Sequence, residues 1–330
     1  MWINKIQFLI FIIFIIYFSK CGVKLVIDHD GGADDAMAIF LALLEEKYFD
    51  GPQVVGLTTV NGNVNETQAF INTQKILGVA ARWDVPIYRG SREALVLDYP
   101  SDYYFGLDGL GDLEGHNVDY KPIKAERLVA ALALIELSKK YKGQLVIVAI
   151  APLTNIALAI KLDPGFISRL KQLYVGAGNV YEENSQEAEF NALLDVEAYH
   201  IVAQYSVSDK VTVVPFNKMK QSLNITKEWR IQELGAINTK IVTAQNEFER
   251  VSLPQSKLWQ LLDPMVMGVA RSSMVETTRL TNNSIILCGP RRGINTNDFM
   301  TDSGNMELIY SASEDKYKEY LLKIFSADKN

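Results

Sequence analysis

Residues 25–39 read Leu-Val-Ile-Asp-His-Asp-Gly-Gly-Ala-Asp-Asp-Ala-Met-Ala-Ile, so that four carboxylates lie between an apolar run and an amphipathic run. The apolar residues 25–27 predict a buried parallel strand, and Gly31-Gly32 predicts a tight turn. A helix with an acidic first turn is expected from Asp34 onward. The carboxylates therefore gather at the carboxyl end of a strand, which is the edge where open α/β sheets bind ligands.

The four carboxylates are those of Asp28, Asp30, Asp34 and Asp35, and they repel one another if they share a cleft. Because burying them without a partner would be costly, we expect a cation among them. Hard divalent cations prefer oxygen ligands, and more than two protein carboxylates favour Ca²⁺ over Mg²⁺. The alternative is structural: Asp34 and Asp35 would complement a helix dipole, and Asp28 would cap a turn.

The pattern of strand, turn and helix recurs along the chain. Further strands are expected at residues 54–60, 85–88, 145–150, 173–175 and 211–214, and the segments 285–287 and 306–310 are expected to close the sheet. Helices are expected at residues 65–80, 125–140, 195–205, 265–270 and 314–326, with helical segments between 225 and 262. This alternation predicts a single α/β domain, with an open, mostly parallel Rossmann-like sheet flanked by helices.

Residues 1–21 are predicted to be a secretory signal peptide. Lys5 precedes an apolar run over residues 8–18 that is too short to span a bilayer comfortably, and cleavage is expected after Cys21. The remaining domain, 22–330, would be secreted to the extracellular space without a membrane anchor. Three N-glycosylation sequons agree with this destination and begin at Asn65, Asn224 and Asn282.

The composition narrows the classes of partner. The net charge of −6 and the lack of a basic tract argue against binding to nucleic acid. The hydrophobic fraction of 48% is enough for a large core. Only Cys288 would remain after signal cleavage, so no internal disulfide is expected. A homo-oligomer is compatible with these features.

The acidic segment resembles the Asp-x-Asp-Pro-Gly-x-Asp-Asp-Ala signature of the inosine-uridine-preferring nucleoside hydrolases, with Gly31 at the position of the proline. Further matches follow in the family's order: Gly62-Asn63-Val64, Asp108-Gly109-Leu110-Gly111, Pro152-Leu153-Thr154-Asn155-Ile156-Ala157, Ala188-Glu189-Phe190-Asn191 and Asp263-Pro264. The resemblance covers nearly the whole mature chain. It implies Ca²⁺-dependent hydrolysis of the N-glycosidic bond of ribonucleosides, giving ribose and a free base.

The resemblance also implies roles for individual residues. The metal ligands would be Asp30, Asp35, Asp263 and the carbonyl oxygen of Thr154, with Asp30 also acting as the base that activates water. Ribose would be bound by Asp34, Asn63, Glu189 and Asn191, and the base would stack on Phe105. In an extended segment, the side chains of Glu189 and Asn191 share one face, with Phe190 pointing into the core.

The chain departs from the family where the leaving base is protonated. Many relatives carry a histidine immediately before the metal-binding aspartate, where this chain has Leu262, and Phe105 stands at a second usual histidine position. His29 and His116 are the remaining candidates for a proton donor. If no side chain protonates the base, purine nucleosides such as inosine should be cleaved faster than uridine.

Two other classes of protein fit part of the pattern. A secreted nucleoside-binding protein would keep the metal site and the ribose contacts with little or no catalysis, although Asp30 would be superfluous in it. A phosphotransferase of the haloacid dehalogenase class also places Asp-x-Asp after a strand. That class needs a threonine or valine where Gly31 and Gly32 stand.

Overall fold

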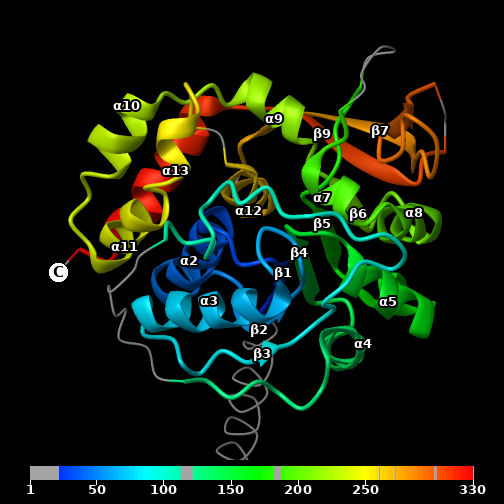
Figure 1. The fold of residues 1–330 in the computed structure, drawn as a ribbon, viewed down its shortest axis with the longest axis horizontal. Helices are drawn as coiled ribbons and strands as arrows, with labels where there is room; N and C mark the ends of the chain where they lie inside the picture. The colour runs from blue at the N-terminus through cyan, green and yellow to red at the C-terminus, as the bar shows by residue number, and fades with distance from the viewer. Residues whose placement is uncertain are drawn as a thin grey trace, which may run out of the picture.

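A computed structural model describes residues 22–112, 122–181, 187–259, 261–271, 273–300 and 303–329, so the predicted signal peptide lies outside the described residues. Nine strands form one sheet in the order β3-β2-β1-β4-β5-β6-β9-β7-β8 (Figure 1). The strands are β1 (Lys24–His29), β2 (Gln53–Thr59), β3 (Ile87–Tyr88), β4 (Leu145–Ala149), β5 (Gln172–Val175), β6 (Val211–Val213), β7 (Val275–Ile285), β8 (Asn295–Asp298) and β9 (Met306–Ala312).

The strand order creates a crevice next to the acidic segment. The strands β3, β2, β1, β4, β5, β6 and β9 run parallel, whereas β7 pairs antiparallel with both β8 and β9. The chain winds from β1 outward to β3, then returns and winds from β4 to β6 in the opposite direction. The order therefore reverses between β1 and β4, and ligands bind outside the carboxyl ends of such a strand pair. The predicted open, mostly parallel sheet is confirmed.

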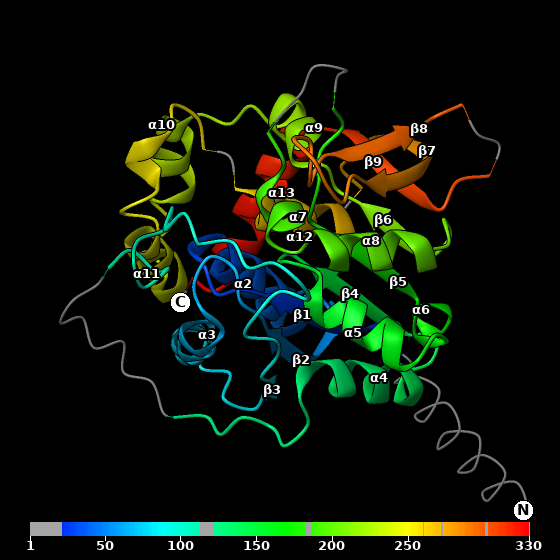
Figure 2. The same cartoon turned by 45° about the vertical axis from the view of Figure 1, so that its right-hand side comes forward.

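Helices cover both faces of the sheet (Figures 1 and 2). They are α2 (Ala33–Tyr48), α3 (Glu66–Val79), α4 (Ala130–Lys140), α5 (Thr154–Leu162), α6 (Phe166–Arg169), α7 (Phe190–Leu194), α8 (Val196–Tyr205), α9 (Phe216–Ser222), α10 (Lys227–Trp229), α11 (Lys240–Phe248), α12 (Leu262–Arg271) and α13 (Glu314–Ser326). A π-helical turn, η1 (Arg230–Leu234), and a 3₁₀ turn, η2 (Leu253–Gln255), lie between α10 and α12.

Two hydrophobic cores explain the continuous apolar runs in the sequence. Leu25 and Ile27 of β1 pack into one core with α2, α12 and α13, whereas Val26 packs into the other with α4, α5 and α8. Successive side chains of a strand point to opposite faces, so a strand covered on both faces must be apolar at every position. Among the described residues, no helix is long and apolar enough to cross a membrane.

Some element boundaries differ from the predicted ones. The helix expected at 125–140 begins only at Ala130, because Glu126 N and Ala130 N donate hydrogen bonds to Ile87 O and Arg89 O beside β3. The strand expected at 285–287 is instead the last residue of β7, which starts at Val275. Most of β7 is exposed and polar, so its sequence contains no apolar run that predicts a strand. The helix expected at 265–270 already begins at Leu262, which places Asp263 inside its first turn rather than at its cap.

Candidate active site

The turn after β1 is held by the side chain of Asp35. Its carboxylate accepts hydrogen bonds from Asp30 N (3.1 Å) and Gly32 N (2.6 Å). Gly31 has φ +81°, and a Cβ there would lie 2.7 Å from Ala69 Cα, so the turn requires glycine in place of the family's proline. The turn therefore directs the start of α2 and its two aspartates back toward the end of β1.

Asp28 lies in β1 and does not cap a turn. It is fully buried and accepts hydrogen bonds from Thr58 Oγ1 (2.5 Å) and Asn155 Nδ2 (2.8 Å). Burial raises the pKa of this carboxyl to about 7. Asn155 also donates to Thr59 O, so it connects the carboxyl ends of β1 and β2 to the start of α5. We infer that Asp28 supports the sheet edge rather than contacting a ligand.

Three buried carboxylates form a group that could hold a metal ion. Oxygen atoms of Asp34, Asp35 and Asp263 lie within 4.8 Å of one another. Burial, followed by repulsion from neighbouring carboxylates, raises the pKa of each of them well above its usual value. This donor set suits a hard divalent cation, which would relieve the repulsion. We call Asp34, Asp35 and Asp263 the carboxylate triad.

Asp30 lies beside the carboxylate triad and is only 1% exposed. Its Oδ2 accepts a hydrogen bond from Asn63 N at 2.8 Å, and burial raises its pKa to about 6. A Cβ on Gly62 would lie 1.8 Å from that oxygen, so only glycine allows β2's carboxyl end to approach Asp30 so closely. The Gly62-Asn63 match in the sequence thus has a steric reason as well as a chemical one.

The side-chain hydroxyl of Thr154 binds Asp195. Thr154 Oγ1 donates a hydrogen bond to Asp195 Oδ2 at 2.7 Å, and the same oxygen accepts from Leu95 N. Asp195 also caps α8 by accepting from Ala198 N. Thr154 is buried at the start of α5, at the carboxyl side of β4. Its carbonyl oxygen stays a predicted metal ligand.

The segment that carries Glu189 and Asn191 is not extended as predicted. Glu189 is the N-cap of α7, and its carboxylate accepts hydrogen bonds from Asn191 N (3.1 Å), Ala192 N (3.0 Å) and Gly178 N (2.7 Å). The helix begins because this carboxylate satisfies its first amides. Phe190 then points toward the cavity described below rather than into the core, where the alternation of a strand would have placed it.

Asn191 joins two strand ends. Its Nδ2 donates hydrogen bonds to Ile150 O (3.2 Å), just after β4, and to Gly176 O (2.8 Å), just after β5. Both Asn191 and Glu189 remain at the surface of the cavity. The structure therefore brings this predicted pair to the site, although by a helix and not by a strand.

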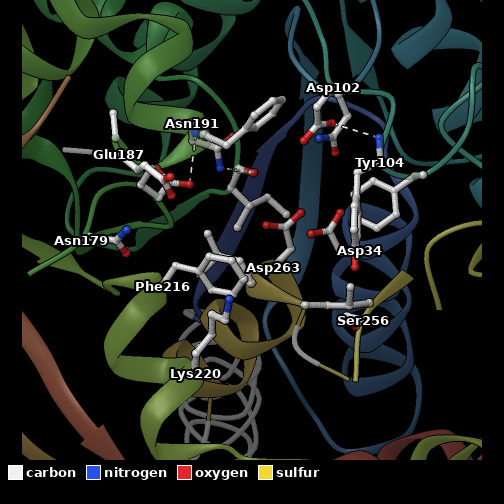
Figure 3. Close-up of a pocket in the computed structure, with 18 residues that line it drawn as sticks. Asp34, Asp102, Tyr104, Asn179, Glu187, Asn191, Phe216, Lys220, Ser256 and Asp263 are labelled. Atoms are coloured by element: carbon white, nitrogen blue, oxygen red, sulfur yellow. Dashed lines mark hydrogen bonds between the residues drawn. The ribbon is translucent and has the colours of Figure 1, made fainter. Parts of the chain in front are cut away.

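A cavity of about 530 Å³ opens above the carboxylate triad (Figure 3). Of the predicted site residues, it is lined by Asp34, Asn63, Phe105, Glu189, Asn191 and Asp263. Residues that the sequence did not single out complete the lining, among them Asp102, Asn179, Glu187, Phe216, Lys220 and Ser256. These residues come from separate loops and α9, so no single motif could have identified them.

Phe105 is 4% exposed and packs edge to face against Tyr104, with ring centroids 4.9 Å apart. Leu262 also lines the cavity, so an apolar side chain occupies the position of the family's histidine. His29 is fully buried in β1 and is not among the described lining residues; burial lowers its pKa to about 3. His116, the other candidate proton donor, lies outside the described residues.

Buried carboxylates that could hold a metal ion lie beside a polar cavity, at the point where a doubly wound sheet reverses its strand order, and this arrangement is typical of an α/β protein that binds a small ligand. The family model described as inosine-uridine preferring nucleoside hydrolase matches residues 25–319. The chain belongs to this family, and the predicted resemblance is confirmed.

Relatives of the chain carry several substrate names. It is 38% identical over 184 residues to "Probable uridine nucleosidase 2" of Arabidopsis thaliana, covering 54% of this chain and 55% of that protein. It is 32% identical over 221 residues to "Inosine-uridine preferring nucleoside hydrolase" of Leishmania major, covering 64% and 66%. The chain thus spans between about half and two thirds of these curated relatives.

Similarity to solved structures extends further along the chain. An "Inosine-Guanosine Nucleoside Hydrolase" is 27% identical with a TM-score of 0.81, covering 92% of this chain and 98% of that one. A "Purine-Preferring Ribonucleoside Hydrolase from Gardnerella vaginalis" is 25% identical with a TM-score of 0.80 and the same coverage. The fold is therefore shared over nearly the full length of these enzymes.

Proposed function

We propose that this protein is a Ca²⁺-dependent nucleosidase that hydrolyses the N-glycosidic bond of ribonucleosides to ribose and a free base. The observation that carries the proposal is the carboxylate triad, buried at the floor of a cavity that also presents Asn63, Glu189 and Asn191. Membership of the nucleoside hydrolase family supports the same reaction.

The donor set favours calcium. Of the carboxylate triad, Asp35 and Asp263 would hold the ion together with Asp30 and the carbonyl of Thr154, and Asp34 would face the sugar instead. Three carboxylates are more than Mg²⁺ usually takes from a protein. The chemistry that a bound ion supplies is the activation and orientation of water. Asp30 is suited to accept the proton of that water, because burial already raises its affinity for protons and Asn63 N fixes its position.

The sugar becomes positively charged as the glycosidic bond breaks. Asp34 is 9% exposed at the cavity surface, so its carboxylate can accept from a ribose hydroxyl and stabilise that charge. Asn63, Glu189 and Asn191 line the same cavity and would bind the remaining hydroxyls. These polar side chains leave the aromatic part of the cavity for the base.

We propose a preference for purine nucleosides such as inosine. Four aromatic residues line the cavity: Tyr104, Phe105, Phe190 and Phe216. A larger base has a larger face to stack on such rings, at about 0.5–1.5 kcal/mol per aromatic contact beyond burial. The comparison of kcat/KM for inosine and uridine tests this preference, and faster cleavage of uridine would refute it.

The direct test of the function is the release of ribose from inosine and uridine by purified protein, before and after removal of metal with a chelator. We expect release that stops on chelation and returns with Ca²⁺. Nucleoside binding without release of ribose would identify a nucleoside-binding protein instead. Restoration by Mg²⁺ but not by Ca²⁺ would refute the choice of metal.

We also propose that the protein is secreted after cleavage of residues 1–21. The sequon residues Asn65, Asn224 and Asn282 are all exposed, which supports their access to the glycosylation machinery, although Asn65 also caps α3 by accepting from Gln68 N. Amino-terminal sequencing of protein recovered from the medium should begin at Gly22 or within a residue or two. Recovery of protein that begins at Met1 would contradict the proposal.

A further inference from the structure

A departing base needs a proton, and the family's usual donor is absent from the cavity. Leu262 and Phe105 carry no exchangeable proton. His29 is sealed in the core, where its Nε2 lies 3.3 Å from Thr73 Oγ1. His116 lies outside the described residues, and among the described residues the remaining candidates are the other side chains that line the cavity.

Tyr104 offers a hydroxyl on the same side of the cavity as Asp34 and Ser256 (Figure 3). The residue is held at both backbone ends: Tyr104 N donates to Asp102 Oδ1 (3.0 Å), and Gln255 Nε2 donates to Tyr104 O (3.0 Å). Its ring is further fixed by the edge-to-face contact with Phe105. A fixed side chain keeps its hydroxyl ready for proton transfer.

The backbone before Tyr104 is strained. Tyr103 has φ +51°, a left-handed conformation that is unfavourable for a residue with a side chain. Tyr103 N donates to Ser101 Oγ (3.2 Å), and Tyr103 O accepts from Gly106 N (2.9 Å). Tyr103 itself is 50% exposed and does not line the cavity. The local structure thus turns one of two adjacent tyrosines into the cavity and leaves the other in solvent.

The hydroxyl of Tyr104 is poised as a donor. Ser256 lines the same side of the cavity, and its hydroxyl donates to Leu258 O at 2.5 Å. Because its proton is already used, Ser256 is a poorer donor to a ligand than Tyr104. Burial, with the nearby carboxylates of Asp34, Glu249 and Asp102, raises the pKa of Tyr104 above its usual value, so it stays protonated at neutral pH.

The lysine of the cavity is placed differently. Lys220 extends from α9, on the opposite side from Tyr104 and Asp34 (Figure 3), and its Nζ lies 4.9 Å from the centroid of the Phe216 ring. Tyr104 lines the cavity on the same side as Asp34, which is proposed to bind the ribose, whereas Lys220 does not.

We propose that Tyr104 is the general acid of the reaction, an inference that rests on the proposed function. As the bond between C1′ and the base nitrogen breaks, its electron pair moves into the base. The O–H bond of Tyr104 breaks at the same time, and its proton forms a new bond to a nitrogen or oxygen of the base. The phenolate then regains a proton from water.

The test compares Tyr104→Phe with the matched control Tyr103→Phe on three substrates: inosine, uridine and 4-nitrophenyl β-ribofuranoside. Nitrophenolate leaves without needing a proton, so its release reports every step except acid catalysis. We expect Tyr104→Phe to lower kcat/KM for both nucleosides by about 10²-fold or more, the usual contribution of a general acid. Its turnover of the nitrophenyl riboside, and its bound metal, should match those of the wild type.

Four results would overturn the inference. Nucleoside turnover by Tyr104→Phe close to the wild-type rate would show that the hydroxyl is dispensable. An equal loss on all three substrates would show that Tyr104 has only a structural role, as would an equal loss in Tyr103→Phe. A wild-type protein that releases ribose from none of the three substrates would refute the proposed function and this inference together. In every other outcome the wild type is active, so only the role of Tyr104 is refuted.

Discussion

The free energy of unfolding of the metal-free protein should fall as the pH rises from about 5 to 8. Burial raises the pKa of Asp28 to about 7 and that of Asp30 to about 6, whereas an unfolded chain has aspartate pKa values of about 3.9. At a pH between the unfolded-state aspartate pKa and the folded-state pKa of Asp30, the folded protein holds two protons, one on each aspartate, that the unfolded chain has lost. The stability that they confer is fully present below about pH 4 and is lost as the pH rises through the folded-state pKa values.

His29 acts in the opposite direction. Burial lowers its pKa to about 3, so below about pH 6.5 the unfolded chain binds a proton that the folded protein lacks. Near pH 5 the folded protein therefore holds one proton more than the unfolded chain, and the free energy of unfolding should fall by about 1.4 kcal/mol per pH unit. The raised pKa values of Asp34, Asp35 and Asp263 make the fall steeper.

Urea unfolding measures this dependence, using protein from which metal has been removed and which is then transferred into metal-free buffers between about pH 5 and 8. A bound divalent cation favours ionised carboxylates, so Ca²⁺ should flatten the dependence. At a concentration 100-fold above its Kd it should also add about 2.7 kcal/mol to the free energy of unfolding. A metal-free protein whose stability stays constant or rises over this range, or one that Ca²⁺ does not stabilise, would refute the reasoning.

Three substitutions make further predictions. Asp35→Asn should abolish Ca²⁺ binding and ribose release while the circular dichroism spectrum is retained, and a fully active variant without metal would contradict the metal assignment. Gly62→Ala would place its Cβ 1.8 Å from Asp30 Oδ2 and so displace the carboxylate of the proposed general base, Asp30. We expect kcat to fall by about 10²-fold. An unchanged kcat would show that Asp30 is not the general base. Leu262→His adds, beside Tyr104, the histidine that many relatives carry at this position, and it should raise kcat/KM for uridine by at least about tenfold relative to inosine. An unchanged ratio would mean that pyrimidine cleavage is not limited by a donor at this wall.

The central part of the fold could be predicted because its signals are local. Parallel strands buried on both faces must be apolar throughout, so β1, β2, β4, β5 and β6 each appear as an apolar run. The acidic segment follows one of these runs directly, which predicts from the sequence alone that Asp34 and Asp35 lie at the carboxyl edge of the sheet. Asn63, which follows β2, lies at the same edge, where its backbone N donates a hydrogen bond to Asp30.

The other side of the cavity could not be predicted in this way. The orientation of Glu189 depends on its hydrogen bonds to Gly178 N and to the first amides of α7, which sequence spacing does not contain. Phe216 and Ser256 reach the cavity through tertiary packing of segments that have no motif of their own. The long strand β7 was missed for a different reason, because its exposed polar residues carry no hydrophobic periodicity.

The hydrogen bonds of Asn191 decide which polar atoms of a ligand can bind beside it. Both hydrogens of its amide group are committed to Ile150 O and Gly176 O, so the side chain can only accept. Glu189, which already accepts from three backbone amides, can likewise only accept when ionised. A polar ligand atom in contact with Asn191 and Glu189 must therefore be a hydrogen-bond donor. A sugar hydroxyl satisfies that demand, whereas an ether or ester oxygen at the same point would face oxygen lone pairs and be turned away.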